Sequence, residues 1–172
     1  MSEKTNVIYI AGSSYSGSTI LGQVLGSDKK VFDAGEVSKY KEIKENNFKI
    51  DPKNEVTNRC TCGRKFNKCE FWSKIYKRYD KKIDFNPAPG FSIENLRIAK
   101  NIIWGNNFDY LNVKSKEYAK YIKVIHREAK KNRNELVYIL DTSKSIYNLI
   151  LVSKSKKINL KVIHLSRNLR DT

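Results

Sequence analysis

The feature that most constrains this chain is an apolar run that passes through a glycine-bearing turn directly into a helix. Residues 6–11 (NVIYIA) are mostly apolar and rich in β-branched side chains, which predicts a buried strand. Residues 12–17 (GSSYSG) are small and polar, and residues 18–25 place their apolar side chains at helical spacing before Gly26. A turn that enters a helix in this way aims backbone N–H groups at one point, so the segment predicts a site for a phosphate group.

The rest of the chain alternates apolar runs with amphipathic segments. Further strands are predicted at residues 31–34, 136–140 and 160–165. Helices are predicted from residue 36 to about 44 and at residues 71–79, 92–104, 115–131 and 145–153. Strands that alternate with helices predict an α/β domain with a mainly parallel sheet.

The length of 172 residues suits a single domain that covers the whole chain. A hydrophobic fraction of 40% argues against a disordered chain, although 30% of the residues are charged. No apolar run approaches the ~20 residues of a membrane span, and no export signal precedes the first strand, so a cytoplasmic location is expected. Residues 46–90 are polar and hold every cysteine and proline, which predicts an irregular insertion.

The chain is strongly basic. Lys and Arg number 34 against 18 Asp and Glu, which gives a formal net charge of +16. The cations are spread out without a block of like charge, as is typical of a solvated surface, but the charge also suits a nucleotide, a nucleic acid or another anionic polymer. A basic module for RNA would need exposed aromatic side chains beside its cations. Most tyrosines here fall at core-type positions, so no specific nucleic-acid partner is predicted.

The turn can be compared with the loop G-x-x-x-x-G-K-[ST] that binds nucleoside triphosphates. Gly12, Gly17 and Thr19 match this pattern, but Ser18 stands in place of the lysine that reaches the β- and γ-phosphates. That difference counts against hydrolysis of ATP or GTP, and Asp141 is the only candidate for the acidic residue that such enzymes carry at a strand end. A P-loop kinase or NTPase stays an alternative, as does an ordinary turn whose serines cap the helix.

Three segments together resemble the bacterial-type sulfotransferases that use 3′-phosphoadenosine 5′-phosphosulfate (PAPS). Residues 7–27 (VIYIAGSSYSGSTILGQVLGS), followed by 31–37 (VFDAGEV), resemble the 5′-phosphosulfate loop G-x-x-[RK]-S-G-[ST]-[ST]. Residues 140–145 (LDTSKS) resemble the D-[ST]-[ST]-K segment, and residues 162–171 (VIHLSRNLRD) resemble the start of the 3′-phosphate site. The resemblance implies a P-loop-type three-layer fold and the transfer of a sulfuryl group from PAPS to a hydroxyl or amine.

The same resemblance implies which residues hold this co-substrate, with no metal required. The 3′-phosphate would be held by Arg167, whose forked guanidinium suits a phosphate, and the 5′ end by Ser14, Tyr15, Ser16, Gly17, Ser18 and Thr19. Tyr15 departs from the family, which has Arg or Lys there to neutralise the transferring group. The chain ends at Thr172, inside the third motif, so the later elements that cover the adenine are expected to be missing. A degenerate protein that binds nucleotide without turnover is a further alternative.

Two residues are candidates for catalysis. Glu36 stands in a G-E position at which the resemblance implies a general base, which takes the proton of the attacking hydroxyl or amine. Lys144 lies at the carboxyl edge of a predicted parallel strand and is expected to steady the sulfuryl oxygens in place of the cation lost at Tyr15. The alternatives are a glutamate that caps the next helix and a surface lysine. The acceptor is expected to be a carbohydrate or small molecule, with a lipid or a peptide left open, and it would bind to residues 40–130.

The three cysteines, Cys60, Cys62 and Cys69, fall within ten residues. Three thiols can occupy three corners of a zinc site, although the spacing is not standard and no fourth ligand is evident nearby. Reduced structural thiols and a Cys62–Cys69 disulfide are the other interpretations, and the odd cysteine count argues against a disulfide framework. His126 is predicted to be structural or exposed, and His164 to be a core residue of its strand.

Overall fold

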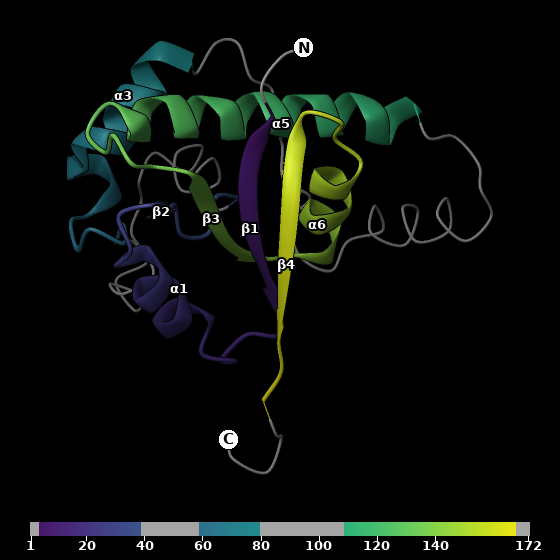
Figure 1. The fold of residues 1–172 in the computed structure, drawn as a ribbon, viewed down its shortest axis with the longest axis horizontal. Helices are drawn as coiled ribbons and strands as arrows, with labels where there is room; N and C mark the ends of the chain where they lie inside the picture. The colour runs from purple at the N-terminus through teal and green to yellow at the C-terminus, as the bar shows by residue number, and fades with distance from the viewer. Residues whose placement is uncertain (1–3, 39–58, 80–108, 168–172) are drawn as a thin grey trace.

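A computed structural model of the chain describes residues 4–38, 59–79 and 109–167 (Figure 1). Its elements, in chain order, are β1 (Thr5–Gly12), α1 (Ser18–Gly26), β2 (Val31–Asp33), the 3-10 helix η2 (Phe66–Lys68), α3 (Glu70–Tyr79), α5 (Asp109–Lys130), β3 (Tyr138–Lys144), α6 (Ile146–Ser153) and β4 (Ile158–Leu165). The helix predicted at residues 92–104 and most of the one predicted up to residue 44 lie outside the described residues. Within the described ranges, no helix is long and apolar enough to cross a membrane.

The four strands form one parallel sheet in the order β2-β3-β1-β4. β1 is a central strand, in register with β4 from Thr5 opposite Ile158 to Gly12 opposite Leu165. Central strands of a parallel sheet are buried on both faces, which explains the continuous apolar run in β1. Helices flank the sheet, so the predicted α/β class with a parallel sheet is confirmed.

The two faces of the sheet carry different helices. Successive side chains of a strand point to opposite faces. Val7 and Tyr9 of β1 join the main core, to which α3, α5 and α6 contribute. Ile10 joins a smaller core on the other face, against which Leu21 and Leu25 of α1 pack. The sheet therefore lies between α1 and the other three helices (Figure 1).

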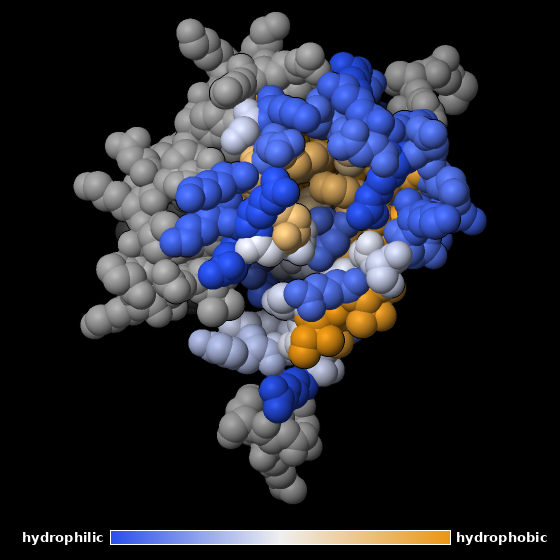
Figure 2. Space-filling view, turned by 90° about the vertical axis from the view of Figure 1, so that its left-hand side faces the viewer, coloured by the Kyte–Doolittle hydropathy of each residue, from blue (hydrophilic) through white to orange (hydrophobic). Residues whose placement is uncertain are grey.

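α1 buries only part of the apolar set that the sequence predicted. Leu21 and Leu25 pack on the sheet, whereas Ile20 is 69% exposed and Val24 is 62% exposed. Figure 2 shows apolar side chains gathered low on this face of the molecule, in the region that α1 occupies. Gly22 and Gly26 allow the helix to approach β2 closely, because a Cβ on Gly26 would lie 2.7 Å from the Cβ of Asp33.

α5 buries the face that its sequence predicted. Tyr118, Ile122 and Ile125 are fully buried in the main core, as their helical spacing indicates. The helix begins at Asp109, earlier than the predicted residue 115. The prediction for His164 was wrong: its side chain is exposed, because β4 is the edge strand of the described sheet and much of its length is uncovered.

β3 ends at Lys144 instead of at Leu140, where the apolar run stops. Asp141 pairs with Tyr9 and Lys144 with Ala11 of β1, with a register irregularity between these pairs. The residues of this extension are polar although most of them are buried, so no hydrophobic pattern marks it. Lys144 is therefore part of the strand end itself.

Two neighbouring strands send their connections to opposite faces. β1 is followed by α1 on one face, and the adjacent strand β3 is followed by α6 on the other. The chain then continues outward in opposite directions, to β2 and to β4. In open α/β sheets, ligands bind at such a switch point, in the crevice beyond the carboxyl ends of the strands. The fold therefore places the candidate site at the turn after β1 and the end of β3.

Candidate functional site

The turn between β1 and α1 has backbone angles that most residues avoid. Tyr15 has a φ of +62° and Gly17 has a φ of +87°, both in the left-handed region. For a bulky residue this conformation costs on the order of 1–3 kcal/mol, and such residues concentrate at functional sites. Left-handed residues in a turn direct neighbouring N–H groups toward one concave point, which suits an anion.

α1 begins without a side-chain cap. Its N-cap is Gly17, and no serine of the turn hydrogen-bonds to another described residue. This argues against the interpretation in which serines cap the helix. Helix geometry leaves the first-turn N–H groups, including those of Ser18 and Thr19, without intrahelical partners. These groups and the positive end of the helix dipole are therefore directed toward an anion.

Ser16 adds a second observation in the same loop. Its hydroxyl oxygen is buried and has no hydrogen-bond partner among the described residues. Buried hydroxyls are nearly always satisfied, so an orphaned one indicates a place for a ligand or water. Of the other residues predicted to hold the nucleotide, Ser18 is buried, whereas Ser14, Tyr15 and Thr19 are exposed.

The end of β4 lies against this loop. Arg167 donates a hydrogen bond from Nη1 to the backbone oxygen of Tyr15 at 3.4 Å. At Gly12, an added Cβ would lie 2.5 Å from the carbonyl oxygen of Leu165. Only glycine therefore permits the strand ends to approach this closely. The structure thus brings Arg167 beside the loop that resembles the 5′-phosphosulfate site.

Glu36 and Lys144 meet at the same edge of the sheet. The Lys144 Nζ lies 2.8 Å from the Glu36 Oε1, with both side chains largely buried. Gly35, with a φ of +67°, turns the chain after β2, and its carbonyl oxygen accepts a hydrogen bond from the Thr142 N–H at 3.0 Å. Since Lys144 pairs with Ala11 of β1, the ion pair lies next to the start of the loop. The contact and the burial argue against a plain surface lysine.

A buried carboxyl group supports the end of β3. Asp141 is fully buried and accepts hydrogen bonds from the Tyr118 hydroxyl and from the N–H and hydroxyl of Ser143. The Ser143 hydroxyl accepts in turn from the Ser38 N–H at 3.2 Å. This network was not predicted from the sequence. The Asp-x-Ser spacing, which lets a side chain bond to the backbone two residues on, is the signal that could have found it.

Asp141 lies on the face of the sheet that points away from α1. Its partner Tyr118 belongs to α5, which covers that face. The next residue, Thr142, points toward α1, where its methyl group would lie 3.1 Å from a Cβ on Gly22. An acidic residue that binds a magnesium–nucleotide complex would have to face the loop and α1. This geometry, with Ser18 in place of lysine, weakens the kinase or NTPase alternative.

The ionisation of Asp141 is expected to make stability fall as pH rises. Burial raises the pKa of this carboxyl group from 3.8 to about 6, against the opposing effect of its hydrogen bonds. The folded state therefore holds the proton at pH values where the unfolded state has lost it. Protonated Asp141 therefore stabilises the folded state fully at pH values below its unfolded pKa of 3.8. This stabilisation, about 3 kcal/mol of unfolding free energy, is lost as pH rises through about 6.

Urea unfolding of the parent chain and of Asp141→Asn, between about pH 4 and about pH 7, measures this effect. The amide cannot ionise, so the free energy of unfolding of the parent, minus that of the variant, should fall across this range. Other carboxylates contribute equally to both proteins and cancel in the difference. A difference that stays flat with pH would show that Asp141 titrates alike in the folded and unfolded states.

No family model, curated protein or solved structure matches this chain. The function is therefore inferred from the residues that meet at the carboxyl edge of the sheet. They supply the N–H groups of the loop, two cations and one carboxylate. This set suits an anionic ligand together with proton transfer from a neutral nucleophile.

Proposed function

We propose that this chain binds PAPS at the carboxyl edge of the sheet and transfers its sulfuryl group to a hydroxyl or amine. The observation that carries the proposal is the meeting of three segments that are far apart in the sequence. Residues 12–19 follow β1, Glu36 pairs with Lys144, and Arg167 contacts the loop. The uncapped helix after a central strand also supports a P-loop-type fold.

Each group in the site has a role in this proposal. The N–H groups of the loop and of α1 bind the 5′-phosphosulfate, and the orphaned Ser16 hydroxyl is a further donor. Arg167 binds the 3′-phosphate through its forked guanidinium. Lys144 steadies the sulfuryl oxygens, as no cation stands at Tyr15. Glu36 is the general base.

The transfer is an in-line displacement at sulfur. The acceptor oxygen or nitrogen forms a bond to sulfur as the bond from sulfur to the 5′-phosphate oxygen breaks, and adenosine 3′,5′-bisphosphate leaves. The Glu36 carboxylate takes the proton of the acceptor. Because Lys144 lies 2.8 Å from Glu36 without nucleotide, it has to turn toward the sulfuryl oxygens when PAPS binds. That movement releases the carboxylate for its role as base.

Calorimetric titration with adenosine 3′,5′-bisphosphate, compared with ATP and magnesium, tests the binding part of the proposal. We expect the bisphosphate to bind more tightly, and Arg167→Ala to weaken its binding by about 10- to 100-fold, because charge-assisted hydrogen bonds to phosphate are lost. Arg127→Ala is the matched control. Arg127 belongs to the last turn of α5 and lies in a basic pocket with Lys4 and Thr5, near the opposite edge of the sheet.

Three results would separate the alternatives. Tighter binding of ATP with magnesium would favour a kinase or NTPase. If Arg167→Ala and Arg127→Ala weaken binding of the bisphosphate equally, Arg167 contributes only as part of a general basic surface. Specific binding of the bisphosphate, without transfer to any acceptor, would favour a nucleotide-binding protein without turnover, in keeping with Tyr15 at the position of the usual cation.

A further inference from the structure

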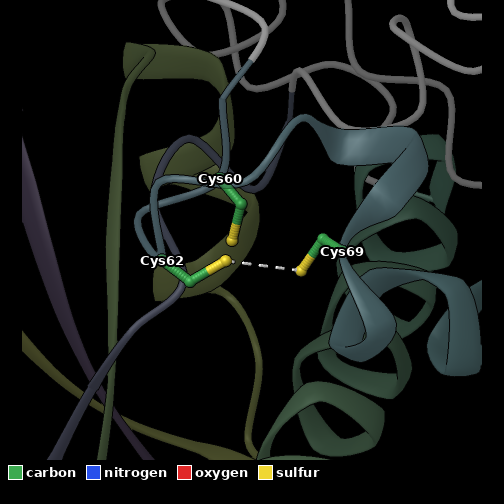
Figure 3. A group of neighbouring side chains, drawn as sticks. All are labelled: Cys60, Cys62 and Cys69. Carbon is green, nitrogen blue, oxygen red and sulfur yellow. Dashed lines mark hydrogen bonds between the residues drawn. The ribbon is translucent and has the colours of Figure 1, made fainter.

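Three cysteine thiols converge on one point beside the end of β2, where the Thr61 hydroxyl donates to the Asp33 carbonyl oxygen at 3.0 Å (Figure 3). Two of them belong to a tight turn, residues 59–65, that is closed by an antiparallel bridge between Arg59 and Lys65. Within this turn the Gly63 N–H donates to the Cys60 carbonyl oxygen at 2.8 Å, and Gly63 has a φ of +80°. The turn therefore holds the side chains of Cys60 and Cys62 on the same side.

The third thiol comes from the start of α3. Cys69 directly precedes this helix, and its carbonyl oxygen accepts a hydrogen bond from the Ser73 N–H at 2.9 Å. Trp72, in the first turn of α3, is 2% exposed in the main core, which fixes the position of the helix start. The turn and the helix are thus held separately, and their thiols point toward each other (Figure 3).

The distances between the thiols suit a metal ion. All three sulfur atoms lie within 4.8 Å of one another, and the Cys62 and Cys69 sulfurs are 3.8 Å apart. Tetrahedral zinc, with Zn–S bonds of ~2.3 Å, holds its sulfur ligands ~3.8 Å apart. A disulfide would require a separation of about 2.05 Å, and the three thiols are free in the structure.

We propose that Cys60, Cys62 and Cys69 bind one zinc ion as three thiolate ligands, with the fourth position open to water or to an incoming ligand. A cavity of about 590 Å³ lies beside the thiols and gives the ion an access path. Three protein ligands and one open position are typical of reactive zinc sites rather than closed structural ones.

Charged side chains of both signs line the same cavity. Three are cations (Arg64, Lys74 and Arg133) and three are carboxylates (Asp33, Glu70 and Glu128), and Arg64 pairs with Glu70 at 3.3 Å. Binding releases the thiol protons to solvent, so zinc affinity is expected to increase with pH. The sequence left zinc as one of three interpretations of these cysteines, because the closeness of Cys69 to the turn depends on how α3 packs on the core.

Zinc binding by the reduced full-length chain tests the proposal. The protein is loaded with zinc chloride, dialysed against metal-free buffer, and analysed for zinc content and affinity. We expect one zinc ion per chain, and Cys62→Ser to lower the affinity at least about 100-fold, since even the loss of a residue that only supports a ligand costs 10- to 100-fold. Cys62 is exposed, so this variant is expected to fold, and circular dichroism without metal checks that it does. Thr61→Ser, in the same turn, is the matched control.

Cobalt provides an independent readout, because tetrahedral cobalt bound to thiolates absorbs visible light strongly. The proposal is supported if cobalt gives this spectrum in the parent and in Thr61→Ser but not in Cys62→Ser. It is overturned if the reduced chain binds no zinc, or if Cys62→Ser binds zinc as tightly as the parent. A Cys62–Cys69 disulfide in the oxidised chain is a further possible result. If the chain does not bind zinc after that disulfide is reduced, the proposal is overturned as well. None of these readouts depends on nucleotide binding.

Discussion

Replacing Glu36 by glutamine is expected to slow sulfuryl transfer by about 10²- to 10⁴-fold, because an amide cannot take the proton of the acceptor. The amide oxygen can still accept a hydrogen bond from Lys144 across the 2.8 Å contact, so the fold and the nucleotide site should be preserved. The measurement is the release of adenosine 3′,5′-bisphosphate from PAPS with a panel of phenols, amines and sugars as acceptors. Calorimetric binding of the bisphosphate by the same variant shows whether the site is intact.

The matched control is Glu117→Gln, which makes the same change in another carboxylate paired with lysine. Both residues belong to α5, where the Glu117 Oε2 lies 3.0 Å from the Lys114 Nζ, and Glu117 has no part in the proposed chemistry. Its variant should transfer at the rate of the parent chain. If Glu36→Gln and Glu117→Gln transfer equally fast, Glu36 is not the base. If Glu36→Gln loses binding and turnover together, Glu36 maintains the shape of the loop instead.

The central strand and its turn could be predicted because one local pattern specifies both. The apolar run of β1 is buried on both faces, and the glycines of the turn meet two separate physical needs. Gly17 adopts a left-handed φ, and Gly12 allows β1 and β4 to approach each other. The neighbouring strands and the long helix were predictable for the same reason, since their patterns report burial directly.

The end of β3 could not be predicted in this way. Asp141 and Ser143 are buried, yet they are polar, so no hydrophobic pattern marks them. Their burial is tolerated because Tyr118, which lies far away in the sequence, reaches the carboxyl group from α5. The contact of Glu36 with Lys144 depends in the same way on the order of strands in the sheet, with β2 next to β3. A local pattern carries no information about that order.

Truncating Trp72 to alanine is expected to lower the free energy of unfolding by about 3–5 kcal/mol, because a large buried side chain is lost and a cavity remains. Trp72 is 2% exposed, and its ring lies edge-on to those of Phe66 and Phe71, with centroids 6.4 Å and 5.2 Å away. Such aromatic pairs add to the contribution of burial itself. Urea unfolding followed by circular dichroism, with metal-free protein, measures the loss.

Tyr15→Ala is the matched aromatic truncation, because Tyr15 is 87% exposed. The positive φ at position 15 is unfavourable for tyrosine and for alanine alike, so the substitution does not change that cost. The free energy of unfolding of this variant should stay within about 0.5 kcal/mol of the parent. Trp72 connects two features of the chain, since it joins α3 to the main core and holds Cys69 opposite the turn with Cys60. Trp72→Ala should therefore weaken zinc binding as well. A loss of less than about 1 kcal/mol would mean that α3 does not pack on the core, and the convergence of the thiols would lose its physical cause.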